Sequence, residues 1–110
     1  MRRMREITGR ELQAHLARGD AVYLIDVREP WEHQTAALPG SVLVPLGQLG
    51  SRIADLAPPD GALVVTYCHH GMRSLSAATL LERAGIGGVC SLIGGIDAWS
   101  VEIDPAVPRY

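Results

Sequence analysis

Two short runs of almost uniformly apolar, β-prone residues constrain the fold of this 110-residue chain most strongly. They span residues 21–26 (Ala-Val-Tyr-Leu-Ile-Asp) and residues 62–67 (Ala-Leu-Val-Val-Thr-Tyr). A strand with one exposed face alternates apolar and polar residues, whereas a strand covered on both faces is mostly apolar throughout. The two runs therefore predict central strands of a mainly parallel sheet that carries helices on both faces.

The segments around these runs predict helices that alternate with strands. Thr8 and Glu11 match a capping box, which predicts a helix that continues to Arg18. We expect Leu12 and Leu16 on the buried face of this helix. Further helices are predicted over residues 30–34, 46–56 and 74–84 and around Trp99, and further strands at Ile7, 41–44 and 89–92. In the helix over 74–84, the residues expected to face inward are Ala77, Leu80, Leu81 and Ala84. This alternation predicts an α/β fold, with residues 101–110 wrapping the surface.

Length and composition indicate one globular domain over residues 1–110. Hydrophobic residues make up 47% of the chain, and the net charge of −2 lacks the basic surplus expected of a nucleic-acid binder. The basic N-terminus, residues 1–5, is not followed by an apolar run, so we do not expect a secretory signal. No apolar stretch approaches the roughly 18 residues that span a membrane. A cytoplasmic location is therefore expected. Two cysteines without a C-x-x-C spacing predict neither a redox pair nor a zinc knuckle.

The segment 68–74 reads Cys-His-His-Gly-Met-Arg-Ser and joins the second apolar run to a predicted helix. It places the thiol of Cys68 at a helix N-terminus, where unpaired backbone N–H groups and the helix dipole favour an anion. Arg73 adds a cation that cannot lose its proton and offers a fork of donors to an incoming oxyanion. We therefore expect a largely anionic, nucleophilic sulfur, surrounded by backbone N–H groups of residues 69–73 in a cradle that Gly71 allows to curve.

Charged residues also follow the first apolar run. Asp26 and Arg28 lie at the C-terminal end of a predicted parallel strand, where open α/β sheets bind ligands. We interpret Asp26 as a buried carboxylate that orders neighbouring loops rather than as a proton-transfer group. Arg28 either pairs with a nearby acid or reaches towards the site. His33 is interpreted as a surface or packing residue, and Cys90 as a small buried hydrophobe.

Three segments resemble, in the expected order, the motifs of rhodanese-like sulfurtransferases. They are the loop 68–74, residues 25–33 (Ile-Asp-Val-Arg-Glu-Pro-Trp-Glu-His) with Leu-Pro-Gly-Ser at 38–41, and residues 94–99 (Gly-Gly-Ile-Asp-Ala-Trp). The resemblance implies the five-stranded rhodanese fold and a persulfide carried on Cys68. The residues that it implies in substrate binding are His69, His70, Gly71, Met72 and Arg73, with Asp26, Arg28 and Ser74 in support.

The resemblance also implies the reaction. A sulfurtransferase of this kind is expected to move sulfane sulfur from thiosulfate or a persulfide donor to cyanide, a small thiol or a protein thiol, with no cofactor. Residues 94–110 further resemble the end of rhodanese domains that are attached to adenylyltransferases in sulfur-carrier pathways. The alternative function is therefore delivery of persulfide sulfur to a sulfur-carrier or persulfide-relay protein.

Two other kinds of site fit the loop less well. Protein tyrosine phosphatases, and phosphatases built on a rhodanese-like fold, place five residues between cysteine and arginine, whereas four separate Cys68 from Arg73. Ser74 occupies the position that a phosphatase requires for arginine, which disfavours phosphate hydrolysis and arsenate reduction. A metal site at Cys68, His69 and His70 is disfavoured because consecutive side chains diverge and no further ligand cluster is present.

Overall fold

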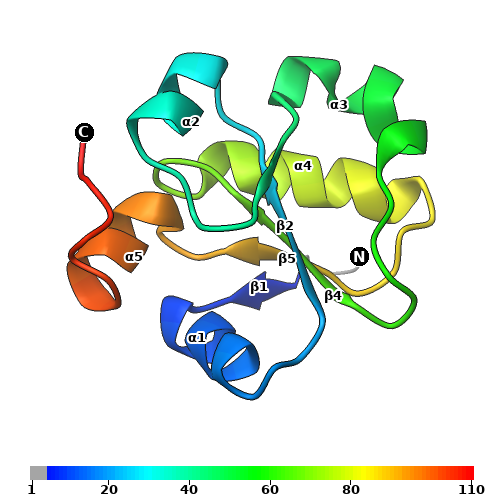
Figure 1. The fold of residues 1–110 in the computed structure, drawn as a ribbon. Helices are drawn as coiled ribbons and strands as arrows, with labels where there is room; N and C mark the ends of the chain where they lie inside the picture. Colours follow the sequence, from blue (N-terminus) through cyan, green and yellow to red (C-terminus); the bar gives the residue numbers. More distant parts are fainter. Residues whose placement is uncertain (1–4) are drawn as a thin grey trace.

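A five-stranded sheet runs through the computed structural model, which describes residues 5–110 (Figure 1). The strands are β1 (Glu6–Ile7), β2 (Val22–Asp26), β3 (Val42–Leu43), β4 (Leu63–Tyr67) and β5 (Val89–Leu92). Their order across the sheet is β1-β5-β4-β2-β3, and all neighbouring pairs are parallel. The predicted α/β class is confirmed. Residues 1–4, which make up most of the basic segment that we do not expect to be a secretory signal, lie outside the described residues.

The two apolar runs form the neighbouring strands β2 and β4 near the centre of the sheet. Their register pairs Val22 with Leu63 at one end and Asp26 with Tyr67 at the other. Because both strands end at the same edge, the residues that follow them emerge side by side. This register brings the segment after Asp26 next to Cys68.

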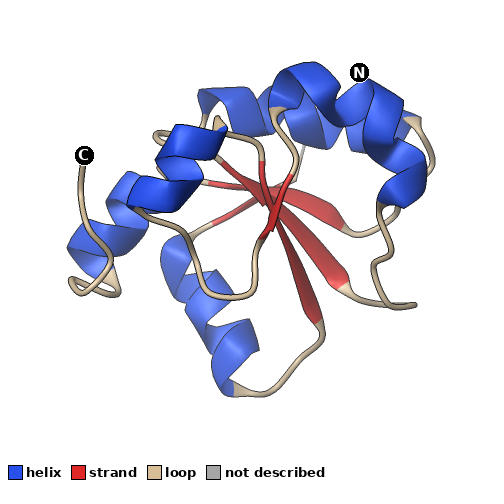
Figure 2. Cartoon of the chain, turned by 45° about the horizontal axis from the view of Figure 1, so that its top comes forward, coloured by secondary structure: helices blue, strands red, loops and turns tan. Residues whose placement is uncertain are grey.

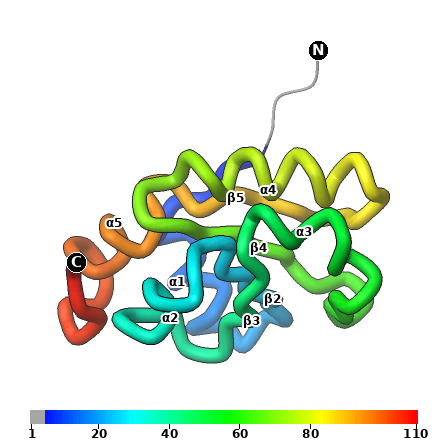
Figure 3. Tube along the Cα trace, turned by 90° about the horizontal axis from the view of Figure 1, so that it is seen from above, coloured from blue at the N-terminus to red at the C-terminus, as the bar shows by residue number. Residues whose placement is uncertain are grey.

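Helices cover both faces of the sheet (Figure 2). They are α1 (Gly9–Ala17), α2 (Pro30–Thr35), α3 (Leu46–Arg52), α4 (Met72–Arg83) and α5 (Gly95–Glu102), with a short 3₁₀ helix, η1, at Ile53–Asp55. The longest, α4, packs on β4 and β5 (Figure 3). No helix within residues 5–110 is long and apolar enough to cross a membrane.

Two hydrophobic cores explain why the central strands are apolar throughout. Successive strand residues point to opposite faces, so Leu24 joins one core and Ile25 joins the other. The first core includes Leu12 of α1 and Trp99 of α5, and the second includes Leu81 of α4. Both faces of β2 are therefore buried, as the sequence predicts.

The N-terminal capping box is confirmed, whereas two expected core positions are wrong. The Thr8 hydroxyl accepts from Glu11 N at 3.1 Å, and the Glu11 carboxylate accepts from Thr8 N at 2.9 Å. Leu16 is 42% exposed because α1 buries residues in its first turns only, where Leu12 lies. Ala84 is exposed because it is the C-cap of α4 and has already left the buried stripe.

Candidate active site

Cys68 directly follows β4 and lies at the C-terminal edge of the sheet, before α4. Gly71 turns the chain between them with φ of +111°, a conformation that residues with a Cβ rarely adopt. It is the N-cap of α4, which begins at Met72 and not at the predicted Ser74. The helix begins earlier because the turn is completed at Gly71, so Arg73 and Ser74 lie in the first helical turn.

The sulfur of Cys68 accepts hydrogen bonds from two backbone N–H groups. Gly71 N lies 3.1 Å from Sγ, and Ser74 N lies 3.4 Å from it. Cys68 is 2% exposed. Gly71 belongs to the predicted cradle of residues 69–73, while the second donor is Ser74, which the sequence placed in a supporting role. Both donors lie at the N-terminal end of α4, so they can stabilise negative charge on Sγ or on a sulfur attached to it.

The Ser74 hydroxyl connects Cys68 to a second buried hydroxyl. Cys68 Sγ donates to Ser74 Oγ at 3.6 Å, and Ser74 Oγ donates to the Gly71 carbonyl oxygen at 3.1 Å. The hydroxyl oxygens of Ser74 and Ser91 lie 2.7 Å apart. Ser74 is thus held through both its backbone and its side chain, which fixes its N–H towards the sulfur. Ser91 lies within β5, and no sequence motif indicated its role.

The N-terminus of α5 holds the beginning of the Cys68 loop. Ile96 N donates to the Cys68 carbonyl oxygen at 2.9 Å, and Asp97 N donates to the His69 carbonyl oxygen at 3.1 Å. Gly95 lies so close that a Cβ there would collide with both carbonyl oxygens. This close backbone approach joins the third sequence motif to the first.

Arg73 is paired with a carboxylate from α2. Its terminal nitrogens donate to Glu32 Oε1 at 2.7 Å and to Oε2 at 2.9 Å. These hydrogen bonds from Arg73 hold the pKa of Glu32 at about 2, well below its ordinary range. The expectation that Arg73 offers a free fork to an oxyanion is therefore wrong, because Glu32 engages both terminal nitrogens. The ion pair instead ties the first turn of α4 to α2.

Asp26 and Arg28 form a buried pair, and both are fully shielded from solvent. Arg28 donates to Asp26 Oδ1 through Nε and to Oδ2 through Nη2, each at 2.8 Å. Asp26 is buried, as expected, and Arg28 pairs with this acid, the first of its two predicted arrangements. His33 is more than a packing residue, because its Nδ1 lies 2.8 Å from Asp26 Oδ2. Its position within α2 brings it back over the end of β2.

The His69 ring stacks on Tyr110 and lies tilted against the His70 ring. The centroids of the His69 and His70 rings are 4.0 Å apart, and the His69 ring lies 4.0 Å from the Tyr110 ring at an angle of 10°. The expectation that consecutive loop side chains diverge is wrong for this pair, because the backbone turns sharply before Gly71. His69 is half-buried, and burial lowers its pKa. His70 and Met72 are exposed.

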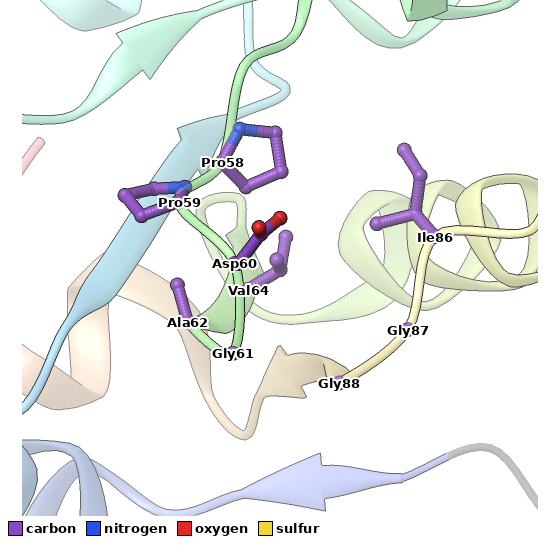
Figure 4. Close-up of a pocket in the computed structure, with 9 residues that line it drawn as sticks. All are labelled: Pro58, Pro59, Asp60, Gly61, Ala62, Val64, Ile86, Gly87 and Gly88. Carbon is purple, nitrogen blue, oxygen red and sulfur yellow. The ribbon is translucent and has the colours of Figure 1, made fainter.

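The described residues form no metal-binding cluster, and one cavity lies away from Cys68. Within residues 5–110, no group of three or more His, Cys, Asp or Glu side chains is arranged to hold a metal ion. A cavity of about 380 Å³ lies between residues 58–64 and 86–88 (Figure 4). It lies where β4 and β5 begin, at the opposite end of the strands from Cys68. Asp60 is the one ionisable side chain that lines it.

The fold and the site define a class of protein: a parallel α/β domain that presents a buried cysteine to the backbone N–H groups of the following helix. The family model described as the rhodanese-like domain matches residues 8–102. The chain therefore belongs to the rhodanese-like family, and relatives named as sulfurtransferases match it.

Relatives of very different length share this domain. A protein of Allochromatium vinosum named Sulfurtransferase is 35% identical over 95 residues, which cover 86% of this chain and 87% of that protein. The chloroplastic rhodanese-like/PpiC domain-containing protein 12 of Arabidopsis thaliana is 39% identical over 95 residues, which cover 83% of this chain and 31% of that protein. The probable adenylyltransferase/sulfurtransferase MoeZ of Mycobacterium tuberculosis is 35% identical over 104 residues, which cover 94% of this chain and 26% of that protein. The chain thus spans less than a third of the two longer relatives.

A solved structure confirms the predicted five-stranded rhodanese fold. The crystal structure of a rhodanese-related protein from Thermoplasma volcanium superimposes with a TM-score of 0.81 at 27% sequence identity. The match covers 96% of this chain and 99% of that one.

Proposed function

We propose that this chain is a sulfurtransferase that carries sulfane sulfur as a persulfide on Cys68. The observation that supports the proposal is the pair of N–H groups, from Gly71 and Ser74, that lie 3.1 and 3.4 Å from Sγ. A persulfide anion needs stabilisation of its charge, and fixed N–H dipoles in a buried site provide it without reorganisation. Membership of the rhodanese-like family supports the same reaction class.

The reaction consists of two displacements at sulfur. In the first, the Cys68 thiolate attacks the outer sulfur of thiosulfate, an S–S bond to Sγ forms, and sulfite leaves with the electron pair of the broken S–S bond. In the second, cyanide or an acceptor thiolate attacks the outer sulfur of the persulfide, and the Cys68 thiolate leaves. In this proposal His69, His70 and Met72, the loop residues near Cys68, influence which donor is accepted, while Arg73 contributes through its ion pair with Glu32.

Intact-mass measurement after incubation with thiosulfate tests the proposal. The wild-type protein should gain the mass of one sulfur atom, and Cys68→Ser should gain none. Cys90→Ser is the matched control, because Cys90 is also 2% exposed but lies within β5, where burial raises the pKa of its thiol. Cys90→Ser should form the persulfide normally. Full transfer by Cys68→Ser, or no persulfide on the alkylation-protected wild-type protein, would contradict the assignment.

Delivery of sulfur to a protein partner is the second candidate. The observation in its favour is that MoeZ, named as an adenylyltransferase/sulfurtransferase, matches 94% of this chain with 26% of its own length. In this function, turnover with free thiosulfate and cyanide is negligible, and transfer from the Cys68 persulfide to a purified sulfur-carrier protein is fast. Equal rates with cyanide and with the carrier protein would favour the first candidate.

A further inference from the structure

Tyr110, which follows α5 after a short segment, makes contacts near both ends of the Cys68 loop. Its hydroxyl accepts from Arg28 Nη1 at 2.6 Å and donates to Glu32 Oε2 at 2.7 Å. Its ring stacks on His69 and meets Trp31 edge-on, with centroids 5.8 Å apart. The last residues pass from the end of α5 towards α2 (Figure 1), where Tyr110 contacts Trp31. No pattern in the sequence predicts these contacts.

We propose that Tyr110 is a positioning residue for sulfur transfer, because it stacks on His69 at the beginning of the loop and, through Glu32, holds Arg73 at its end. The Glu32 carboxylate accepts from both Arg73 and Tyr110. Gly71 lies in the sequence between His69 and Arg73, the two residues that Tyr110 holds, and the Gly71 N–H donates to Sγ at 3.1 Å. This inference rests on the proposed sulfur transfer for its kinetic readout.

The group that holds the Tyr110 hydroxyl is itself buried and paired. Arg28, which donates to the Tyr110 hydroxyl, is fully buried and is paired with the equally buried Asp26 at the end of β2. Burial raises the pKa of Tyr110 to about 12, so its hydroxyl keeps the proton that it donates to Glu32 at neutral pH. The contacts of Tyr110 therefore connect the loop to the central sheet.

The position of the loop matters because the N–H groups act through their direction and distance. A donor that is displaced by about 1 Å loses much of its effect on a developing charge, and such displacements reduce rates by up to about 100-fold. Removal of the positioning contacts should therefore lower kcat while KM for the sulfur donor changes little.

Two substitutions separate the contributions of the Tyr110 ring and hydroxyl. Tyr110→Phe keeps the stack on His69 and loses both hydrogen bonds, and we expect kcat to fall about tenfold. Tyr110→Ala also loses the stack on His69, and its kcat should be lower still. Tyr23→Phe is the matched control. The Tyr23 hydroxyl also accepts a hydrogen bond, from Ala57 N at 3.3 Å, but Tyr23 lies near the start of β2, at the opposite end of the strands from Cys68. Its kcat and KM should equal those of the wild type.

Alkylation of the cysteines provides a readout that does not depend on turnover. At alkaline pH, thiols ionise without help from neighbouring donors, so the labelling rate reports access to the sulfur. As the loop loosens, iodoacetamide should then label Cys68 faster, in the order wild type, Tyr110→Phe, Tyr110→Ala, while burial keeps Cys90 protected. Slower transfer together with faster labelling of Cys68 alone supports the proposal. Wild-type kinetics and labelling in Tyr110→Ala, or equal acceleration at both cysteines, which indicates global unfolding, would overturn it. If the wild-type protein transfers no sulfur, the proposed function fails, and the order of labelling still tests the role of Tyr110.

Discussion

Replacement of Glu32 by glutamine should destabilise the protein at neutral pH and remove part of its sensitivity to acid. Glu32 is 3% exposed and accepts hydrogen bonds from both terminal nitrogens of Arg73 and from the Tyr110 hydroxyl. Glutamine keeps the shape of the side chain and one acceptor oxygen, but it loses the charge. The substitution therefore tests the electrostatic contribution of the ion pair with little change in packing.

The pKa of Glu32 determines the expected magnitude. It is about 2, against an ordinary value of 4.5, mainly because Arg73 donates to the ionised carboxylate. One pKa unit corresponds to about 1.4 kcal/mol, so the ionised form contributes roughly 3 kcal/mol to the free energy of unfolding. The Arg73 side chain is 37% exposed, and solvent screens the interaction. We therefore expect Glu32→Gln to lower the free energy of unfolding by about 2 kcal/mol at pH 7.

The pH dependence follows from the direction of the shift. As pH falls from about 4.5 towards 2, the unfolded chain protonates Glu32 before the folded protein does, so the stabilisation is lost in that window. Urea denaturation over this range should show the difference between wild type and Glu32→Gln narrowing as pH decreases. Glu102→Gln, at the exposed end of α5, serves as the control and should follow the wild type. Equal stability of wild type and Glu32→Gln at pH 7, or a difference that is constant with pH, would refute the reasoning.

Two further predictions concern the support of the loop. Gly95→Ala should lower the free energy of unfolding by more than about 2 kcal/mol in urea denaturation, because the new Cβ would meet the backbone carbonyl oxygens of Cys68 and His69. Gly47→Ala in α3 is the control. Its Cβ would meet no atom within 4 Å, so this variant should be as stable as the wild type or slightly more stable. The imidazole of His69 should titrate below the ordinary 6.5 in NMR spectra, because burial disfavours its charged form. Its pKa should rise towards 6.5 in Tyr110→Ala; a wild-type value of 6.5 would contradict the burial argument.

The sequence by itself determined the features that depend on neighbouring residues. The apolar runs predicted buried parallel strands, since a covered strand needs apolar side chains on both faces. Thr8 and Glu11 predicted the first helix because a capping box is a contact within one turn. The sequence also placed Cys68 at a helix N-terminus, because the strand, the loop and the helix follow one another directly along the chain. The start of α4 was predicted two residues late, because the φ of Gly71 decides where the helix can begin.

Only the tertiary structure decided which charged groups meet around the loop. Glu32 and Arg73 are 41 positions apart, and Glu32 and Tyr110 are 78 apart. Such pairs leave no periodic pattern, because a carboxylate can accept from any donor that the fold brings within about 3 Å. The order of the strands places the end of β2 beside the end of β4, and this adjacency brings α2 against the first turn of α4. The guanidinium group of Arg73, which was expected to face an incoming oxyanion, therefore forms an ion pair with Glu32, and Tyr110 lies next to the Cys68 loop.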